Sequence, residues 1–266
     1  MTARVPVLAG LPAYRVAVAG LPMRAEPAMD RSGAVVVVDG ATPWWDAAQR
    51  ALDDGAAALL VAEPRDVPLE AVRRLVATAE APIVVHRARL RADLVERALG
   101  QREHRAPRIV VAECRADARD LASMVRDAVG WVRSFAGGPP AVASASAASD
   151  GGSALLRSAD DRRVVGSLIA SLTTPAGATL RVQALGEATT ELEIDEPAGR
   201  SELSTSTARG RLVAPARHEA GERVALRRAI EVLAGGSGSR DLADLLNDEE
   251  AASAILRLEA GRRIFS

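Results

Sequence analysis

Three short apolar runs, alternating with helical patterns, constrain the fold of this chain more than any other feature. They cover residues 33–39, 57–62 and 82–86 and are rich in valine, leucine and isoleucine. Between them, residues 45–54 and 69–80 repeat apolar positions at helical spacing. A strand that is apolar on both faces is typical of a parallel sheet covered by helices. The alternation therefore predicts a parallel α/β layer with right-handed crossovers.

The segment before residue 33 is short for a complete dinucleotide-binding domain. Residues 14–19, Tyr-Arg-Val-Ala-Val-Ala, alternate in a way that indicates a strand ending at Gly20. About 30 residues leave room for roughly one β-α-β unit. Residues 1–103 are therefore predicted to form a truncated Rossmann-like domain.

The second part, residues 104–266, has a different pattern. A strand at 108–113 and a helix at 120–135 precede short β-rich runs separated by turn signals, which favours an antiparallel sheet. These runs are 141–147, 164–173, 178–184 and 189–194, with one or two more strands in 201–213; helices resume at 222–233 and 241–257. The predicted fold class is α/β plus α+β: a Rossmann-like domain, then a domain with a mainly antiparallel open sheet and helices.

Composition excludes several classes of function. A formal net charge of −1 gives no electrostatic reason to expect nucleic acid or an anionic membrane as a partner. The chain has no lysine, which excludes Schiff-base chemistry and a Walker-type lysine. Cys114 is the single cysteine, and His86, His104 and His218 match no zinc signature, so no metal site is expected. Without a signal-like or membrane-spanning stretch, a cytoplasmic location is expected.

Several local patterns follow one another in the order that one family of dehydrogenases has them. Within residues 33–43 an apolar run is followed by a proline at Pro43, and residues 50–55 read Arg-Ala-Leu-Asp-Asp-Gly. The next apolar run ends in Glu63-Pro64, and residues 241–261 form the last helical pattern. Over roughly residues 33–265 the chain resembles the Gfo/Idh/MocA family of NAD(P)-dependent sugar and cyclitol dehydrogenases. The resemblance implies a nucleotide domain followed by a substrate and oligomerisation domain.

Residues 120–131 resemble the active-site helix of that family. Asp120, Met124, Asp127 and Trp131 fall at i, i+4, i+7 and i+11, so they share one face of a helix. In the family pattern, the position of Met124 holds the histidine that takes the sugar hydroxyl proton, and that of Asp127 orients the substrate. The alternative is an ordinary amphipathic helix whose alanines and valines face a core.

Three departures from the family pattern remove the chemistry that it implies. After the expected first strand, Gly20-Leu-Pro22 offers one glycine and a proline, whereas the phosphate turn needs several glycines to approach the pyrophosphate closely. Glu63 stands where the family has the lysine of "E-K-P", which reverses the charge beside the substrate hydroxyl. Met124 has no useful basicity. We therefore expect no cofactor and no hydride transfer.

What remains is a possible remnant of a substrate pocket. Its candidate substrate-binding residues are Asp120, Met124, Asp127, Trp131 and Glu63. Carboxylates and an aromatic ring can hold a polyhydroxylated ligand by hydrogen bonds and stacking. A solvent-facing Asp127 with no ligand is an equally good interpretation. His86 is interpreted as a hydrogen-bonded structural histidine, although it ends a strand where a ligand could sit.

Three functions remain open. The first is a non-catalytic oxidoreductase homologue that serves as a structural or regulatory subunit through its C-terminal sheet. Its partner would be a second copy or a dehydrogenase-like subunit. The second is a sugar- or cyclitol-binding module. The third is an NAD(P)-dependent oxidoreductase with a rearranged cofactor site, or with one supplied by a partner.

Overall fold

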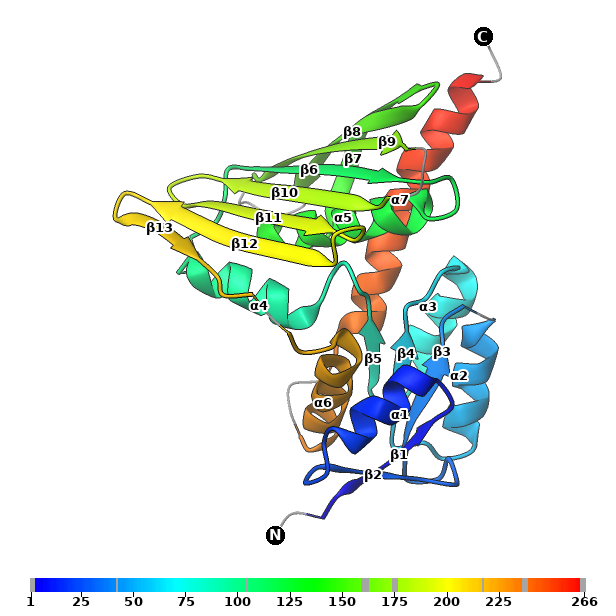
Figure 1. Ribbon diagram of the computed structural model, residues 1–266. Coiled ribbons are helices and arrows are strands. Elements are labelled where there is room, and N and C mark those ends of the chain that lie inside the picture. The colour runs from blue at the N-terminus through cyan, green and yellow to red at the C-terminus, as the bar shows by residue number, and fades with distance from the viewer. Residues whose placement is uncertain are drawn as a thin grey trace. The chain divides into compact units, whose positions relative to one another are not determined.

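The computed structural model describes residues 3–41, 43–103, 105–158, 163–173, 177–216, 218–235 and 239–263. The chain divides into two compact units (Figure 1). Unit 1 contains Met1–Ala92 and His218–Leu246, and unit 2 contains Asp93–Arg217 and Asn247–Ser266. The expected division at residues 103 and 104 differs from this one because a late helix, α6 (Gly221–Leu233), packs on the strands of unit 1. A single boundary along the sequence cannot describe a unit that contains two separate segments of the chain.

Unit 1 is a parallel sheet of five strands in the order β2-β1-β3-β4-β5. The strands and intervening helices are β1 (Val5–Ala9), α1 (Pro12–Ala19), β2 (Ala25–Pro27), β3 (Val35–Asp39), α2 (Trp44–Asp53), β4 (Ala58–Ala62), α3 (Leu69–Thr78) and β5 (Ile83–His86). The Rossmann-like domain is confirmed. Its order lacks the outermost strand of the six-stranded dinucleotide fold, because only one β-α-β unit precedes β3.

The segment predicted as a strand at residues 14–19 is a helix, α1. Its buried residues Tyr14, Ala17 and Val18 are followed by buried Leu21, and this is the i, i+3, i+4, i+7 spacing of a helix face. Pro12 at the first helical position and Gly20 at the C-cap mark its ends. The alternation of valine and alanine therefore predicted a strand wrongly. The first strand of the chain is β1.

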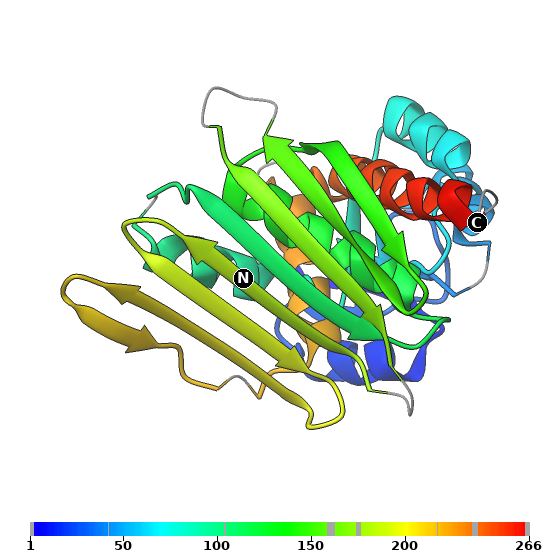
Figure 2. The same cartoon turned by 90° about the horizontal axis from the view of Figure 1, so that it is seen from above.

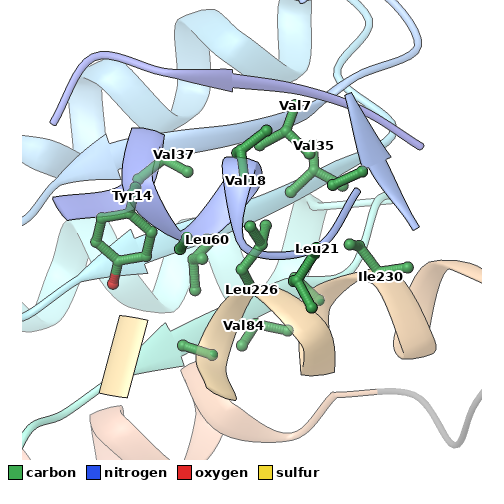
Figure 3. Packing of buried hydrophobic residues seen from close by; sticks show 14 of the residues in the cluster. Val7, Tyr14, Val18, Leu21, Val35, Val37, Leu60, Val84, Leu226 and Ile230 are labelled. Carbon is green, nitrogen blue, oxygen red and sulfur yellow. The ribbon is translucent and has the colours of Figure 1, made fainter. Parts of the chain in front are cut away.

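Two hydrophobic clusters sandwich the parallel sheet. One cluster joins α1 and α6 to one face, with Val18, Val37, Leu60 and Leu226 at its centre (Figure 3). The other joins α2, α3 and the start of α7 (Asp241–Arg263) to the opposite face. Every residue of β4 is buried, because helices cover both of its faces.

Unit 2 is built on an eight-stranded sheet in the order β13-β12-β11-β10-β6-β9-β8-β7 (Figure 2). Its elements are α4 (Ala92–Gln101), β6 (Ile109–Ala116), α5 (Leu121–Ala136), β7 (Pro140–Ala148), β8 (Gly151–Ser158), β9 (Val165–Leu172), β10 (Thr179–Leu185), β11 (Thr189–Asp195), β12 (Arg200–Thr207), β13 (Gly210–Val213) and the rest of α7. All neighbouring strands are antiparallel except β6 and β9. The mainly antiparallel open sheet is confirmed, although strand β8 was missed at the Gly151-Gly152 turn signal.

The sheet of unit 2 has one covered and one open face. Along β6, Val110 and Ala112 are fully buried, whereas Ile109 and Glu113 are exposed. Helix α5 packs on β6, β9 and β10 and supplies the cover. This alternation is expected of a sheet with helices on one face only.

A buried arginine, Arg102, fastens the end of α4 to the β10–β11 hairpin within unit 2. Its Nη1 donates to the carbonyl oxygens of Ala184 and Ala188 at 2.8 Å each, and its guanidinium lies 5.8 Å from the ring centre of Phe135. Burial lowers the pKa of Arg102. The carbonyl bonds compensate for the lost hydration of the cation.

Within the described residues, every helix is too short or too polar to cross a membrane.

Candidate functional site

The structure brings three of the predicted site residues together on α5. Met124, Asp127 and Trp131 lie in this helix, and Asp120 is the residue immediately before it. The backbone N–H of Asp120 donates to the Oδ1 of Asp117 at 3.0 Å. The helical spacing that the sequence predicted is therefore correct.

The burial of these side chains argues against a ligand pocket on α5. Met124 and Trp131 are 0% exposed and Asp127 is 3% exposed. The ring of Trp131 packs against Phe135, with 5.8 Å between ring centres. The burial of Asp127 contradicts the alternative in which it faces solvent. A fully buried indole has no free face on which a sugar could stack.

The charged groups on α5 pair with other charged side chains inside unit 2. Asp127 lies 4.0 Å from the Nε of Arg126, and Arg126 reaches Glu249 at 3.4 Å. Arg133 binds Asp248 of α7 through two contacts of 2.8 and 3.2 Å. Asp248 is fully buried. This part of α5 therefore fastens one helix to another, which is a structural use of its charges.

Glu63, the fifth predicted site residue, belongs to unit 1 and stands directly after β4. Its backbone has a φ of 49°, in the left-handed region that non-glycine residues seldom adopt. Backbone hydrogen bonds hold this turn: Glu63 N–H donates to the His86 carbonyl at 2.9 Å, and Gly40 N–H to the Ala62 carbonyl at 2.8 Å. A Cβ on Gly40 would overlap that carbonyl oxygen, so glycine is required there.

The turn places Glu63 beside a pair of buried groups that sequence reasoning did not join. The Tyr14 hydroxyl lies 2.7 Å from the Nδ1 of His86, and a carboxylate oxygen of Glu63 lies 3.9 Å from the same nitrogen. His86 is thus hydrogen-bonded, as its structural interpretation predicted. Tyr14 was missed because residues 14–19 were read as a strand; a helical reading turns its ring inward.

The three groups meet at the carboxyl edge of the parallel sheet. Tyr14 is in the first turn of α1, Glu63 follows β4, and His86 ends β5. In open α/β sheets this edge is where ligands bind. Burial raises the pKa of Tyr14 above its ordinary value, and the carboxylates of Glu222 and Glu63 raise it further. The phenol is therefore neutral at physiological pH.

The turn between β1 and α1 is the place where a dinucleotide-binding fold holds the pyrophosphate. It reads Gly10-Leu-Pro-Ala-Tyr-Arg15, so only the first glycine of G-x-G-x-x-G is present. Gly20-Leu-Pro22, which the sequence predicts at this turn, instead follows α1. Pro12 occupies the first helical position and has no N–H to donate. The residues present do not fit the usual pyrophosphate contacts.

Metal ligation has no support among the described residues, where no group of three or more His, Cys, Asp or Glu side chains is placed to hold an ion. His104, one of the three histidines considered above, lies outside the described residues.

No family model matches the sequence. No curated protein matches it either. Solved structures do match. An oxidoreductase from Sinorhizobium meliloti superimposes with a TM-score of 0.70 at 16% identity, over 97% of this chain and 98% of that one. UDP-N-acetylglucosamine 3-dehydrogenase GnnA from Acidithiobacillus ferrooxidans gives 0.70 at 15% identity, over 97% and 98%. A putative NADPH-dependent oxidoreductase from Desulfitobacterium hafniense gives 0.73 at 11% identity, over 98% and 97%.

These neighbours have the fold that the resemblance predicted. The chain has the fold of Gfo/Idh/MocA-type oxidoreductases, across both units. At such low identity the likeness establishes the fold alone, and a fold hosts many functions.

Proposed function

We propose that this chain is a non-catalytic oxidoreductase homologue, and that it acts as a structural or regulatory subunit through the open sheet of unit 2. The observation that carries the proposal is Met124. It occupies the position that the resemblance assigns to the proton-accepting histidine, and it is fully buried. A thioether has no proton-accepting capacity at neutral pH, and a buried one meets no substrate.

Two features of unit 1 support the same proposal. Glu63 puts a carboxylate where the resemblance implies a lysine that polarises the substrate hydroxyl. A negative charge there opposes the removal of a proton from that hydroxyl. The Gly10–Arg15 turn lacks two of the three glycines and one backbone donor. Base, electrophile and cofactor cradle are thus altered at separate places in the chain.

The open face of unit 2 supports assembly as the remaining role. Ile109 and Ile169 are 42% and 45% exposed on the central strands β6 and β9. On the same face, Glu113 stands opposite Arg181 of β10, and Arg181 stands opposite Glu193 of β11. Apolar residues at the centre beside charges of both signs are suited to self-pairing or to a related subunit.

Light scattering tests the assembly. The wild-type chain, alone or with a dehydrogenase-like subunit, is expected to form a dimer or a larger species. Ile109→Asp with Ile169→Asp should shift it to the monomer, because the two carboxylates would have to be buried without partners. Met29→Asp is the matched control, since Met29 is 91% exposed in unit 1. A wild-type monomer that captures no dehydrogenase-like subunit would overturn the proposal.

A second candidate function, a ligand-binding module, is favoured by the backbone of Glu63. A non-glycine residue held at positive φ beside titratable groups is a feature that concentrates at binding sites. Two structural neighbours are named as dehydrogenases of UDP-N-acetylglucosamine and, putatively, of myo-inositol. A panel of nucleotide sugars and cyclitols is therefore the appropriate thermal-shift screen. A saturable shift that Glu63→Gln abolishes would establish this function.

A further inference from the structure

Tyr14, His86 and Glu63 form one contact cluster inside unit 1, and its geometry is unusual in one respect. The hydroxyl of Tyr14 and the carboxylate of Glu63 both approach the same atom, the Nδ1 of His86, at 2.7 and 3.9 Å. We propose that His86 is a protonation-dependent switch whose Nδ1 bonds Tyr14 when the ring is neutral and Glu63 when it is charged. Nδ1 is then an acceptor in one state and a donor in the other.

The neutral state follows from the burial of the phenol. Tyr14 is 2% exposed, and among the described residues His86 is the hydrogen-bond partner of its hydroxyl. A buried O–H that donates to nothing loses the free energy of its hydration. We assign the hydroxyl as the donor to Nδ1, which puts the proton of the neutral imidazole on Nε2.

Protonation reverses the role of Nδ1. A charged imidazole has N–H groups at both ring nitrogens, so Nδ1 no longer accepts from Tyr14. A carboxylate oxygen of Glu63 lies 3.9 Å from this nitrogen, and the side chain of Glu63 is 58% exposed. A charge-assisted N–H to carboxylate bond is about twice as strong as a neutral one. The protonated ring is thereby drawn to Glu63.

Burial and a neighbouring carboxylate act on the ring in opposite directions. Ring burial, at 5% exposure, disfavours the charged form, and Glu63 favours it. The other charged groups near the pair are Glu222 in the first turn of α6, which acts on Tyr14, and Arg87, Arg91 and Arg228, which line a cavity of about 20 Å³ with His86. Ring position is constrained by Gly221, where a Cβ would lie 2.7 Å from Nε2.

Protonation of His86 affects α1, the helix that carries Tyr14. Tyr14 sits in the first turn of this eight-residue helix, which has no side-chain N-cap. Its bond to His86 ties that turn to the end of β5. Losing the bond on protonation frees the first turn of α1, together with the adjoining turn at Gly10.

The chain offers a specific probe, because Tyr14 is its only tyrosine. With tyrosine labelled by carbon-13 at Cζ, the single NMR signal is titrated from pH 8 to pH 5. The expected result is one sigmoidal step, in the range where histidine titrates. Amide hydrogen exchange of residues 13–19 should accelerate below the step.

Three variants identify the titrating group. His86→Gln abolishes the step, because the amide that replaces the ring does not titrate. Glu63→Gln keeps the step but moves its midpoint to lower pH, because the carboxylate that stabilises the charged ring is gone. His218→Gln removes an exposed histidine and leaves the step unchanged. Glu63→Gln keeps the proposal testable if His86→Gln fails to fold.

A Tyr14 signal that is independent of pH from 8 to 5 in the wild type would overturn the switch. So would a step that persists in folded His86→Gln, or a midpoint that Glu63→Gln leaves in place.

Discussion

The two units differ in the burial and contacts of the residues that the resemblance assigns to a substrate site. In unit 2, two of the positions that the resemblance assigns to the substrate site lie in the interior: Met124 and Trp131 are fully buried. In unit 1, the carboxyl edge of the sheet still gathers Tyr14, His86 and Glu63 around one nitrogen. Met124 and Trp131 are thus core residues of unit 2, whereas titratable groups meet at the edge of the sheet in unit 1.

The strongest way to probe unit 2 is to break the buried ion pair of α5. Asp248→Ala removes the partner of Arg133 and leaves a cation inside the unit, so the free energy of unfolding should fall by about 3–5 kcal/mol. Glu231→Ala is the control in unit 1, where the pair with Arg24 is about half exposed and should contribute less than about 1 kcal/mol. Urea unfolding monitored by tryptophan fluorescence measures both. Equal losses would contradict the contrast.

Met124 tests whether its position is core or site. Met124→Ala should lower the free energy of unfolding by about 3 kcal/mol, because it opens a cavity in a fully buried position. Met124→His should also destabilise unit 2, and it should not create NAD(P)-dependent turnover. Urea unfolding and a cofactor absorbance assay measure the two outcomes. Turnover in Met124→His would mean that α5 forms part of an active site, and would contradict this account.

Tyr14 measures what the cluster contributes to unit 1. Tyr14→Phe keeps the packed ring and removes the hydroxyl, which leaves Nδ1 of His86 without that donor. A loss of about 1–2 kcal/mol is expected. The side chain of Phe135 in unit 2 has no polar atom to form a hydrogen bond. Phe135→Leu therefore serves as a packing control. A loss near zero for Tyr14→Phe would mean that solvent replaces the hydroxyl.

The backbone of Glu63 gives the smallest expected effect and the opposite sign. Glu63→Gly should raise the free energy of unfolding by up to about 1 kcal/mol, because glycine adopts positive φ without strain. Glu63→Ala keeps the strained backbone and removes the same carboxylate, so it is the matched control. A thermal unfolding series of both variants decides the matter. If alanine stabilises as much as glycine does, the gain comes from the charge rather than from the backbone.

The success of the sequence predictions varied with the number of surfaces that each element buries. The strands β3, β4 and β5 are largely buried on both faces, so short runs of valine, leucine, isoleucine and alanine identified them. Helix α1 was misread because its valines alternate with alanines, which are small enough to lie on either face. Strand β8 begins with two glycines, which indicate a turn as readily as an edge of sheet.

The candidate site was harder to predict for a physical reason. The spacing of Asp120, Met124, Asp127 and Trp131 correctly gave a shared helix, but spacing does not report what covers that helix. Tyr14 and His86 are separated by 72 positions in the sequence, so their contact arises only from the packing of α1 against the sheet. Glu63 was found by the resemblance, whereas its positive φ has no local sequence signal.

The most direct test of the central claim, that this chain has the fold without the chemistry, is a calorimetric titration with NADH and NADPH up to millimolar concentration. The full chain is titrated alone and again with any dehydrogenase-like subunit that copurifies with it. We predict no saturable heat in the first titration, and in the second only the heat that the partner gives by itself. Saturable binding to this chain, with one cofactor for each copy, would contradict the account.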